Sequence, residues 1–295
     1  MTIEDRTVSV IIPAFNEEQV IGSLVAKVID QNLAMEVIVV DDGSQDATAE
    51  KARQAGARVF RHPYNIGNGA AVKSGIRMAR GDIMVFMDGD GQHDPEDIPA
   101  LLAPLSEYDM VVGARERKHQ ASIRRFFGNM VFNFLASYVA KFAIKDLTSG
   151  FRAVRGHIAK RFLYLLPNTY SYPTTLTLGV LRSGRRVKYV PIQTRQRQQG
   201  HSNIKIFSDG IRFFLIITKI CVFYSPFRVF LPISFLMFVA GLSRYIYTFV
   251  MEHRFTNMSA LLFITSVLIF MLGLVSEQIC HLRYDKVEDD RVFKQ

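Results

Sequence analysis

Residues 83–95 read I-M-V-F-M-D-G-D-G-Q-H-D-P, an apolar run that ends abruptly in acidic residues. The run Ile83–Met87 is typical of a strand buried on both faces of a sheet. Asp88 and Asp90 follow two residues apart, so on an extended backbone both carboxylates project from the same side. The glycines that alternate with them let a ligand approach the backbone closely. The stretch therefore predicts a strand that delivers two carboxylates to one edge of a sheet.

This pair of carboxylates is a candidate metal site. Hard oxygen ligands at the carboxyl end of a strand suit a Mg²⁺ or Mn²⁺ ion that carries substrate phosphates. The alternative is an acidic turn that only closes a strand, and D-x-D alone favours that alternative. Two further apolar runs, Val8–Ile12 and Val37–Val40, also end in polar residues. Because open α/β sheets bind ligands at strand carboxyl ends, the context favours a site.

Strands and helices alternate along the first two thirds of the chain. This spacing predicts an α/β domain with a mostly parallel sheet covered by helices on both faces. The expected strands are Val8–Ile12, Val37–Val40, Arg58–Arg61, Ile83–Met87, Met110–Val112, a strand within Leu147–Val154, and Val187–Ile192. The expected helices end near Ile29, Ala55 and Ala79 or lie near Ile98–Leu105 and over Ser122–Phe142.

Charge and composition limit the function classes. The 295 residues carry a formal net charge of +9, and 49% of them are hydrophobic, with the apolar residues concentrated in the last third. No basic helix with interleaved aromatic residues is present, so anionic lipid headgroups and phosphorylated substrates explain the charge better than nucleic acid. The two cysteines, Cys221 and Cys280, lie in apolar surroundings and indicate no disulfide framework. The amino terminus carries no signal peptide, which predicts a cytoplasmic first domain.

Two apolar runs near the carboxyl end predict a membrane hairpin. Phe230–Val250 covers about 21 residues, roughly 31 Å as a helix, which matches a hydrocarbon core of about 30 Å. Ser259–Ile279 is similar, and a short polar loop joins the two. Basic residues flank the outer ends of the hairpin, whereas the loop has a single arginine. The positive-inside rule therefore predicts an enzyme in the inner (cytoplasmic) membrane with its catalytic domain and both termini in the cytoplasm.

A third apolar segment precedes the hairpin. Ile204–Tyr224 places Lys205, Asp209, Arg212 and Lys219 on one helical face, as expected for a helix that lies in the membrane surface. A further membrane span is the alternative, and the four charges argue against it. The expected organisation is a catalytic domain over 1–202, an amphipathic juxtamembrane helix over 203–227, the hairpin over 228–281 and a cytoplasmic tail over 282–295.

Several short motifs follow one another in a recognisable order. They are I-P-A-F-N-E (12–17), V-D-D-G-S (40–44), N-I-G (65–67), D-G-D-G-Q-H (88–93), T-S-G-F-R (148–152) and R-Q-Q-G-H-S (197–202). The series resembles the family 2 glycosyltransferases of the polyprenyl-phosphate branch, which includes dolichyl-phosphate mannose synthase. The resemblance covers residues 8–225 and extends to the hairpin by type. Each motif alone is weak, and their order is specific.

The resemblance implies a nucleotide-sugar-binding GT-A fold and assigns roles to particular residues. It implies that Asp88, Asp90 and Gln92 hold Mg²⁺ or Mn²⁺. The donor nucleotide would be bound by Pro13, Phe15, Glu17, Asp41 and Asp42. The lipid phosphate and donor pyrophosphate would be held by Arg115, by Arg124 or Arg125, and by Arg197 with Ser202, and Lys205 is a further candidate for the acceptor phosphate. Asp88, Asp90, Arg115 and Arg197 would form the catalytic set.

Two positions depart from the family pattern. Asn203 stands where this branch usually has a lysine, so either Lys205 takes over that phosphate contact or phosphate binding is weaker. Gly128 and Asn129 stand where a serine usually contacts phosphate, which puts that contact in doubt.

The implied reaction is a single displacement with inversion, in which one sugar passes from GDP-mannose or a UDP-hexose to undecaprenyl or dolichyl phosphate. The resemblance also implies a homo-oligomer, for which a tetramer is the family example. One alternative is a processive polysaccharide synthase, but its Q-x-x-R-W motif needs tryptophan and this chain has none. The other is a non-catalytic nucleotide-binding membrane scaffold, which would not need an intact metal site. The sequence does not identify the sugar or the base.

Overall fold

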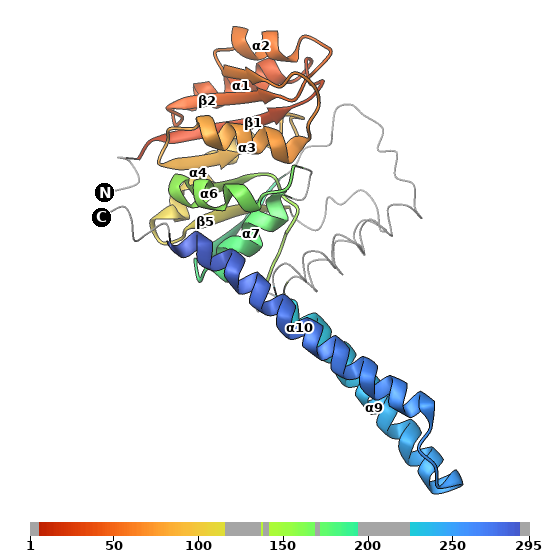
Figure 1. Ribbon diagram of the computed structural model, residues 1–295. Coiled ribbons are helices and arrows are strands. Elements are labelled where there is room, and N and C mark those ends of the chain that lie inside the picture. Colours follow the sequence, from red (N-terminus) through yellow and green to blue (C-terminus); the bar gives the residue numbers. More distant parts are fainter. Residues whose placement is uncertain (1–5, 116–136, 138–141, 169–171, 194–224, 290–295) are drawn as a thin grey trace. The chain divides into compact units, whose positions relative to one another are not determined.

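The computed structural model describes residues 6–115, 137, 142–168, 172–193 and 225–289 (Figure 1). These residues belong to two compact units. One contains a seven-stranded sheet with its helices, and the other contains two long helices. Most of the predicted helix over Ser122–Phe142 and most of the predicted juxtamembrane helix over 203–227 lie outside the described residues.

The sheet has the strand order β3-β2-β1-β4-β6-β5-β7. Every neighbouring pair is parallel except those of β6, which runs antiparallel to both β4 and β5. The prediction of a mostly parallel sheet is therefore confirmed. The strands are β1 (Val8–Ala14), β2 (Glu36–Asp41), β3 (Arg58–Arg61), β4 (Ile83–Phe86), β5 (Met110–Arg115), β6 (Arg152–Arg155) and β7 (Val187–Ile192).

Helices cover both faces of this sheet, as the alternating pattern predicts. They are α1 (Ile21–Asp30), α2 (Thr48–Gln54), α3 (Asn68–Met78), α4 (Ile98–Leu102), α6 (Gly156–Phe162) and α7 (Tyr172–Arg182). Short 3₁₀ turns are formed by Pro95–Asp97, Ala103–Ser106 and Leu163–Leu165. The predicted helix near Ile98–Leu105 is thus an α-helix followed by a 3₁₀ turn.

Alternate residues of β1 pack against different helices, which shows why its sequence is almost entirely apolar. Val10 and Ile12 belong to the buried cluster that also contains Val25 of α1. Ile11 points the other way, towards α3, where a Cβ added to Gly75 would lie 2.3 Å from Ile11 Cγ2. A strand buried on both faces is apolar at nearly every position. The exception in β1 is Ser9, whose buried hydroxyl donates to Glu36 Oε1 at 2.7 Å. The absence of a side chain at Gly75 lets α3 lie close to β1.

The second unit is an antiparallel helical hairpin, α9 (Phe227–Glu252) and α10 (Asn257–Asp289), whose helices lie side by side (Figure 1). Both predicted apolar runs are helical. Their 26-residue candidate spans, Phe227–Glu252 and Asn257–Leu282, have mean hydropathies of 1.8 and 2.5 and are long and apolar enough to cross a membrane. Helix α9 ends at His253, which has a left-handed φ of 51°. Helix α10 continues through residues 282–289, beyond the predicted start of the tail.

Polar side chains within the hairpin bond between its two helices. Ser234 Oγ donates to the carbonyl oxygen of Ser266, and Ser266 Oγ donates to that of Ser234, each at 2.9 Å. Near the end where α9 begins, Glu277 Oε2 accepts a hydrogen bond from the backbone N–H of Phe227 at 3.1 Å. A helix start leaves N–H groups without partners inside the helix, so Glu277 satisfies one of them. These bonds fix the two helices against each other.

Candidate active site

A cleft of about 400 Å³ lies beside the carboxyl ends of β1, β2 and β4. It is lined by Pro13, Ala14, Phe15, Glu17, Asp42, Asn65, Asn68, Ala71, Asp88, Gly89 and Asp90. Four segments therefore meet in one place. They are the first polar loop, which follows β1 and carries Phe15 and Glu17; the acidic turn after β2, with Asp42; the asparagine loop, with Asn65 and Asn68; and the D-x-D turn, with Asp88 and Asp90. Most of the residues predicted to bind the donor nucleotide or the metal are among them.

The D-x-D turn is held close to the first polar loop. A Cβ added to Gly89 would lie 2.9 Å from the carbonyl oxygen of Pro13, so the two chain segments approach as only glycine permits. Gly91 has a φ of 71°, in the left-handed region that favours glycine. Asp90 Oδ1 accepts a hydrogen bond from the backbone N–H of Gln92 at 3.1 Å. The turn after β4 is thus shaped by its glycines and by Asp90.

Asp88 is enclosed by the T-S-G-F-R loop and by a histidine. A Cβ added to Gly150 would lie 2.4 Å from Asp88 Oδ2, so the carboxylate occupies the space that a side chain would take. His93 Nε2 lies 3.7 Å from the same oxygen. The imidazole is buried and stacks on Phe151 with ring centroids 5.0 Å apart. These contacts orient Asp88 while 34% of its side chain stays exposed.

The donor atoms of this turn fit a hard divalent cation. Asp88, Asp90 and Gln92 are all partly exposed and offer carboxylate and amide oxygens. Among the described residues, no group of three or more His, Cys, Asp and Glu side chains is arranged to hold a metal. Mg²⁺ is usually bound by one or two carboxylates together with water or phosphate oxygens, so two carboxylates and an amide fit such an ion.

On the other side of Asp88, Arg115 at the end of β5 is paired with Asp146. The guanidinium donates from Nε to Asp146 Oδ2 at 2.8 Å and from Nη2 to Oδ1 at 3.1 Å, and Nη2 also donates to Thr148 Oγ1 at 2.6 Å. Although burial alone lowers it, the pKa of Arg115 is raised by its hydrogen bonds to Asp146 and by the charges of Asp146 and Asp88. Arg115 is therefore a fixed cation within the field of Asp88.

Arg152 anchors the T-S-G-F-R loop from below. It is fully buried and donates hydrogen bonds to the carbonyl oxygen of Pro173 at 2.7 Å, to Thr177 Oγ1 at 3.0 Å and to the carbonyl oxygen of Ser149. Burial lowers the pKa of Arg152 despite the charges of Asp146 and Asp88 nearby. The loop that encloses Asp88 is thereby tied to helix α7.

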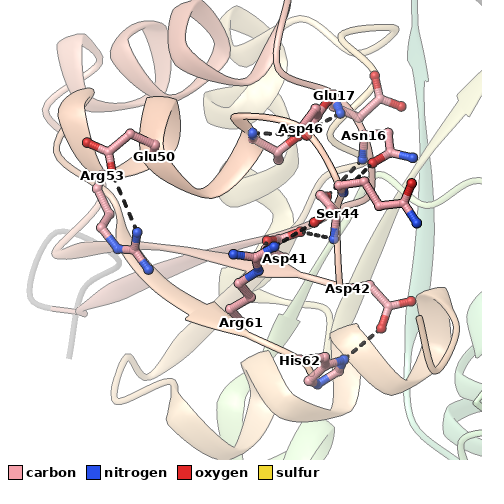
Figure 2. Close-up of polar contacts among 12 residues, drawn as sticks. Asn16, Glu17, Asp41, Asp42, Ser44, Asp46, Glu50, Arg53, Arg61 and His62 are labelled. Carbon is pink, nitrogen blue, oxygen red and sulfur yellow. Dashed lines mark hydrogen bonds and ion pairs between the residues drawn. The ribbon is translucent and has the colours of Figure 1, made fainter. Parts of the chain in front are cut away.

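One wall of the cleft is built from two interlocked loops (Figure 2). Asn16, with a left-handed φ of 55°, donates from its backbone N–H to Ser44 Oγ at 2.9 Å and accepts at Oδ1 from Gln45 N–H at 2.9 Å. Glu17 N–H donates to Thr48 Oγ1 at 2.9 Å. The loop after β1 is thus fixed to the loop after β2. Phe15, at its tip, remains 42% exposed at the cleft.

The two aspartates of the V-D-D-G-S motif differ in position. Asp41 is fully buried, accepts from Ser44 N–H at 2.9 Å and lies 3.1 Å from Nε of Arg61. It does not line the cleft. Asp42 does line the cleft, and its carboxylate accepts hydrogen bonds from the backbone N–H groups of Ile66 and Gly67 at 3.0 and 2.8 Å. The motif therefore supplies one buried structural residue and one residue at the site.

The remaining predicted residues cannot be placed. Arg124, Arg125, Arg197, Ser202 and Lys205 lie outside the described residues. The structure adds residues that the motifs did not single out for a role. They are Asn65, Asn68, His93 and Asp146. Asn65 and His93 belong to the motifs N-I-G and D-G-D-G-Q-H, which is the sequence signal for them. Asn68 directly follows N-I-G. Asp146 lies two residues before T-S-G-F-R and has no sequence signal of its own.

Two protein-family models match the chain. Glycosyl transferase family 2 matches residues 9–163, and the GtrB C-terminal hairpin matches residues 225–282. The first match includes all of the residues that line the cleft.

Three relatives each match about two thirds of the chain or more. An uncharacterized protein of Methanocaldococcus jannaschii is 34% identical over 65% of this chain and 83% of its own length. Dodecaprenyl-phosphate galacturonate synthase of Rhizobium johnstonii is 30% identical over 69% of this chain and 63% of its own length. Undecaprenyl-phosphate 4-deoxy-4-formamido-L-arabinose transferase of Proteus mirabilis is 28% identical over 79% of this chain and 73% of its own length.

A solved structure shares the fold. The Mycobacterium tuberculosis glucosyl-3-phosphoglycerate synthase in complex with Mn²⁺, uridine diphosphate and phosphoglyceric acid aligns with a TM-score of 0.60. It covers 74% of this chain and 79% of that one at 24% sequence identity.

Proposed function

The chain belongs to glycosyl transferase family 2, and from that membership we propose that it transfers one sugar from a nucleotide sugar to a membrane polyprenyl phosphate. The donor would be GDP-mannose or a UDP-hexose, the acceptor undecaprenyl or dolichyl phosphate, and the sugar carbon would be inverted. One observation carries the proposal: the same chain joins an acid-lined cleft at the end of β4 to a helical hairpin that matches a family model of its own. Two relatives named as polyprenyl-phosphate sugar transferases support it.

The acceptor's chemistry determines what the site must do. A phosphomonoester is largely dianionic near neutral pH because its second pKa is about 6. Such a nucleophile needs positioning and charge neutralisation more than it needs a general base. The site would therefore hold two anionic groups, the acceptor phosphate and the donor diphosphate, next to one sugar carbon.

Asp88, Asp90 and Gln92 would hold Mg²⁺ or Mn²⁺ against the donor diphosphate. When bound, the cation neutralises charge that develops on the departing nucleoside diphosphate. Gly150 and His93 keep Asp88 facing the cleft. This chain's own contribution is to fix the carboxylates before the substrate arrives.

Arg115 does not line the cleft itself, but it is a partly exposed cation whose charge interacts with Asp88, and it would bind a phosphate held next to that residue. Its Nε and Nη2 are engaged by Asp146 and Thr148, whereas Nη1 makes no hydrogen bond within the described part of the chain. One-third of the side chain is exposed. A guanidinium held on one side can offer its other side to a phosphate oxygen with little loss of side-chain freedom. Arg124, Arg125, Arg197, Ser202 and Lys205 would complete phosphate binding.

On the donor side, Phe15 would stack on the base, and Glu17, Pro13 and Asp42 would contact the nucleoside. The carboxylate of Asp41 is buried and does not line the cleft. Asp41 would therefore contribute indirectly, by accepting a hydrogen bond from the backbone N–H of Ser44 and so fixing the turn that carries Asp42. Nothing described at this wall identifies the base.

We further propose that the hairpin crosses the inner membrane and holds the catalytic domain on its cytoplasmic side. The proposed organisation is catalytic domain 1–202, juxtamembrane helix 203–227, hairpin 228–281 and cytoplasmic tail 282–295, assembled as a homo-oligomer. The apolar surfaces of α9 and α10 support membrane insertion, because their residues are largely exposed within the unit.

The proposal is tested with purified full-length protein in bilayer nanodiscs. A panel of GDP- and UDP-sugars is incubated with undecaprenyl phosphate and Mg²⁺ or Mn²⁺, and the lipid product and the nucleoside diphosphate are both measured. Formation of a one-sugar lipid phosphate with equal release of nucleoside diphosphate is expected for one donor. Products with many sugars would indicate a processive synthase. Nucleotide binding without turnover across the whole panel would indicate a scaffold.

A further inference from the structure

Three side chains form a hydrogen-bonded series behind the donor wall of the cleft. Asp42 Oδ1 lies 2.7 Å from His62 Nδ1, and His62 Nε2 lies 2.9 Å from Ser74 Oγ. Asp42 follows β2, His62 follows β3 and Ser74 lies on α3. Figure 2 shows the ring of His62 directed at the carboxylate of Asp42. Both residues are almost completely buried, with 3% and 5% of their surfaces exposed.

The direction of the inner bond follows from the chemistry of its partners. An ionised carboxylate can only accept, so Nδ1 of His62 carries the proton and donates. Ser74 then either donates to a neutral Nε2 or accepts from a protonated one. In both states the imidazole donates to Asp42. The bond is therefore independent of the protonation state of His62.

Asp42 passes this constraint on to the loop that follows His62. Its Oδ1 also accepts from Ile66 N–H, and its Oδ2 accepts from Gly67 N–H. The residues on either side of these two amides, Asn65 and Asn68, both line the cleft. A carboxylate accepts about four hydrogen bonds, so one position, on Oδ2, remains for a ligand. The position of Asp42 thus sets both its own contact and the position of the asparagine loop.

The backbone around this series is also tightly packed. A Cβ added to Gly43 would lie 2.5 Å from the carbonyl carbon of Tyr64, so the turn after Asp42 lies against the loop. Gly67 has a φ of 122° and directly precedes α3. The loop is therefore fixed at its end by α3 and in its middle by Asp42.

Asp42, His62 and Ser74 are hydrogen-bonded in the same order as the catalytic triad of a Ser-His-Asp hydrolase. Their position behind the cleft excludes that role. Neither His62 nor Ser74 lines the cleft, so the hydroxyl cannot reach a substrate there. A buried series that ends at a cleft residue positions that residue. We propose that His62 is a positioning residue for the donor nucleotide: it holds the Asp42 carboxylate, and through it the loop 65–68, in the geometry that binds the nucleoside. The assignment of the ligand as a sugar donor rests on the proposed function.

Two substitutions of His62 distinguish the roles of its two ring nitrogens. Asparagine places an amide N–H near the position of Nδ1, so His62→Asn keeps the donor to Asp42. Glutamine places its amide near Nε2, so His62→Gln loses that donor and keeps a partner for Ser74. His157→Gln serves as the control, because His157 is exposed at the start of α6 and does not line the cleft.

The first measurement is titration of the full-length protein in detergent with UDP and with GDP in the presence of Mn²⁺. His62→Gln should weaken binding of the nucleotide that the wild type prefers by about tenfold or more, the usual loss when a hydrogen bond to a charged group is removed. His62→Asn and the control should stay within about threefold of the wild type. In turnover, His62→Gln should raise the KM for the donor and leave the KM for the lipid acceptor unchanged.

A second measurement does not depend on the ligand. Hydrogen exchange at the amides of Ile66 and Gly67 should accelerate in His62→Gln and stay slow in His62→Asn. If the wild type bound neither nucleotide, the proposed donor would be wrong, and this exchange would still decide the role of His62.

Equal nucleotide binding by the two variants would overturn the proposal, as would unchanged exchange in His62→Gln. If His62→Gln does not fold, Ser74→Ala replaces it, since that variant keeps the imidazole and removes only its outer partner. It should weaken nucleotide binding by roughly fivefold, a typical effect of losing one neutral hydrogen bond and more than the threefold margin allowed for the control. Wild-type binding by Ser74→Ala in that case would count against the proposal.

Discussion

Arg115 and Asp146 form a two-pronged ion pair, with Nε 2.8 Å from Oδ2 and Nη2 3.1 Å from Oδ1. The pair joins the end of β5 to the segment that precedes the T-S-G-F-R loop. Its geometry leaves Nη1 of Arg115 directed away from Asp146, and the charge of Asp88 contributes to the raised pKa of Arg115. The position of this guanidinium therefore depends on Asp146, a residue that does not line the cleft.

Asp146→Asn should reduce transfer without removing donor binding. The amide cannot accept both hydrogen bonds, so Arg115 loses its fixed orientation. A loss of about ten- to hundredfold in kcat/KM is expected from steady-state kinetics, with UDP or GDP binding near the wild-type value. Asp109→Asn is the matched control, because Asp109 pairs with Arg155 at 3.6 Å and directly precedes β5, at the end opposite Arg115. A folded Asp146→Asn enzyme with wild-type kcat/KM would show that Arg115 needs no such support.

The same pair predicts a pH dependence of stability. Although burial raises it, the pKa of Asp146 is lowered overall by the hydrogen bonds and charge of Arg115 and by Thr148. A carboxyl whose pKa is lower in the folded state stabilises the protein above its unfolded pKa of about 3.9, and this contribution is lost as the pH falls through the folded pKa. Heat denaturation followed by circular dichroism should show Asp146→Asn roughly 2–3 kcal/mol less stable than the wild type at pH 7. The difference should shrink below about pH 4; a difference that grew with acidity would contradict the pairing.

Gly150→Ala should inactivate the enzyme by displacing Asp88. The added methyl group would lie 2.4 Å from Asp88 Oδ2, so the carboxylate must move. Gly22→Ala is the matched control, since its methyl group would meet nothing closer than 3.7 Å. Transfer assays should show a loss of at least about a hundredfold for Gly150→Ala, in line with a misplaced ligand, and wild-type rates for Gly22→Ala. Retained activity in Gly150→Ala would mean that Asp88 is not needed in its present position.

Metal dependence is tested on Asp90. Asp90→Asn should abolish transfer while the circular dichroism spectrum stays unchanged, because one metal ligand is lost and β4 is not. EDTA should stop the wild-type reaction, and added Mn²⁺ or Mg²⁺ should restore it. Full activity in EDTA, or in the variant at saturating metal, would rule out the proposed ligand set.

The role of the hairpin is tested by ending the chain at Ser225. Every residue that lines the cleft precedes this point, so nucleotide binding should persist in a calorimetric titration. Activity on long-chain acceptor in bilayers should fall strongly, because the tether no longer concentrates the enzyme at the lipid phosphate. A short, water-soluble polyprenyl phosphate should restore much of the rate. A truncated protein that binds nucleotide but stays inactive on this acceptor would mean that the hairpin or an oligomer contributes to the site.

Strands buried on both faces were predictable from the sequence because their signal is local. Val8–Ile12 and Ile83–Met87 are continuous apolar runs that end in polar turns, and the D-x-D at the second end was therefore placed correctly at a sheet edge. Helix α7 was not predicted. Its sequence, Y-P-T-T-L-T-L-G-V-L-R, is rich in β-branched residues and contains proline and glycine, which have poor helix propensity. It is supported by packing and by Arg152, which donates to the carbonyl oxygen of Pro173.

The support of the site was less predictable than its central residues. Asp146 meets Arg115 across 31 positions, and nothing in the local sequence indicates that pairing. Asp42 was predicted as a donor ligand, but its three bonds within the protein, to His62, Ile66 and Gly67, follow only from how β2, β3 and α3 are arranged. Motifs identify residues that substrates require, whereas the residues that hold them are set by tertiary structure.

The antiparallel strand β6 has a consequence for how the protein is made. Strand β5 pairs only with β6 and β7 within the described sheet, so during translation it has no partner until residues 152–155 have left the ribosome. The four strands β3-β2-β1-β4 can assemble earlier as a nascent subdomain that already carries Phe15 and Asp42. In that interval the edge of β4 is unpaired, and an open strand edge is a template for wrong association with other chains. A ribosome that stalls after β5 would therefore release a protein with one finished wall of the cleft and an exposed, apolar strand beside it.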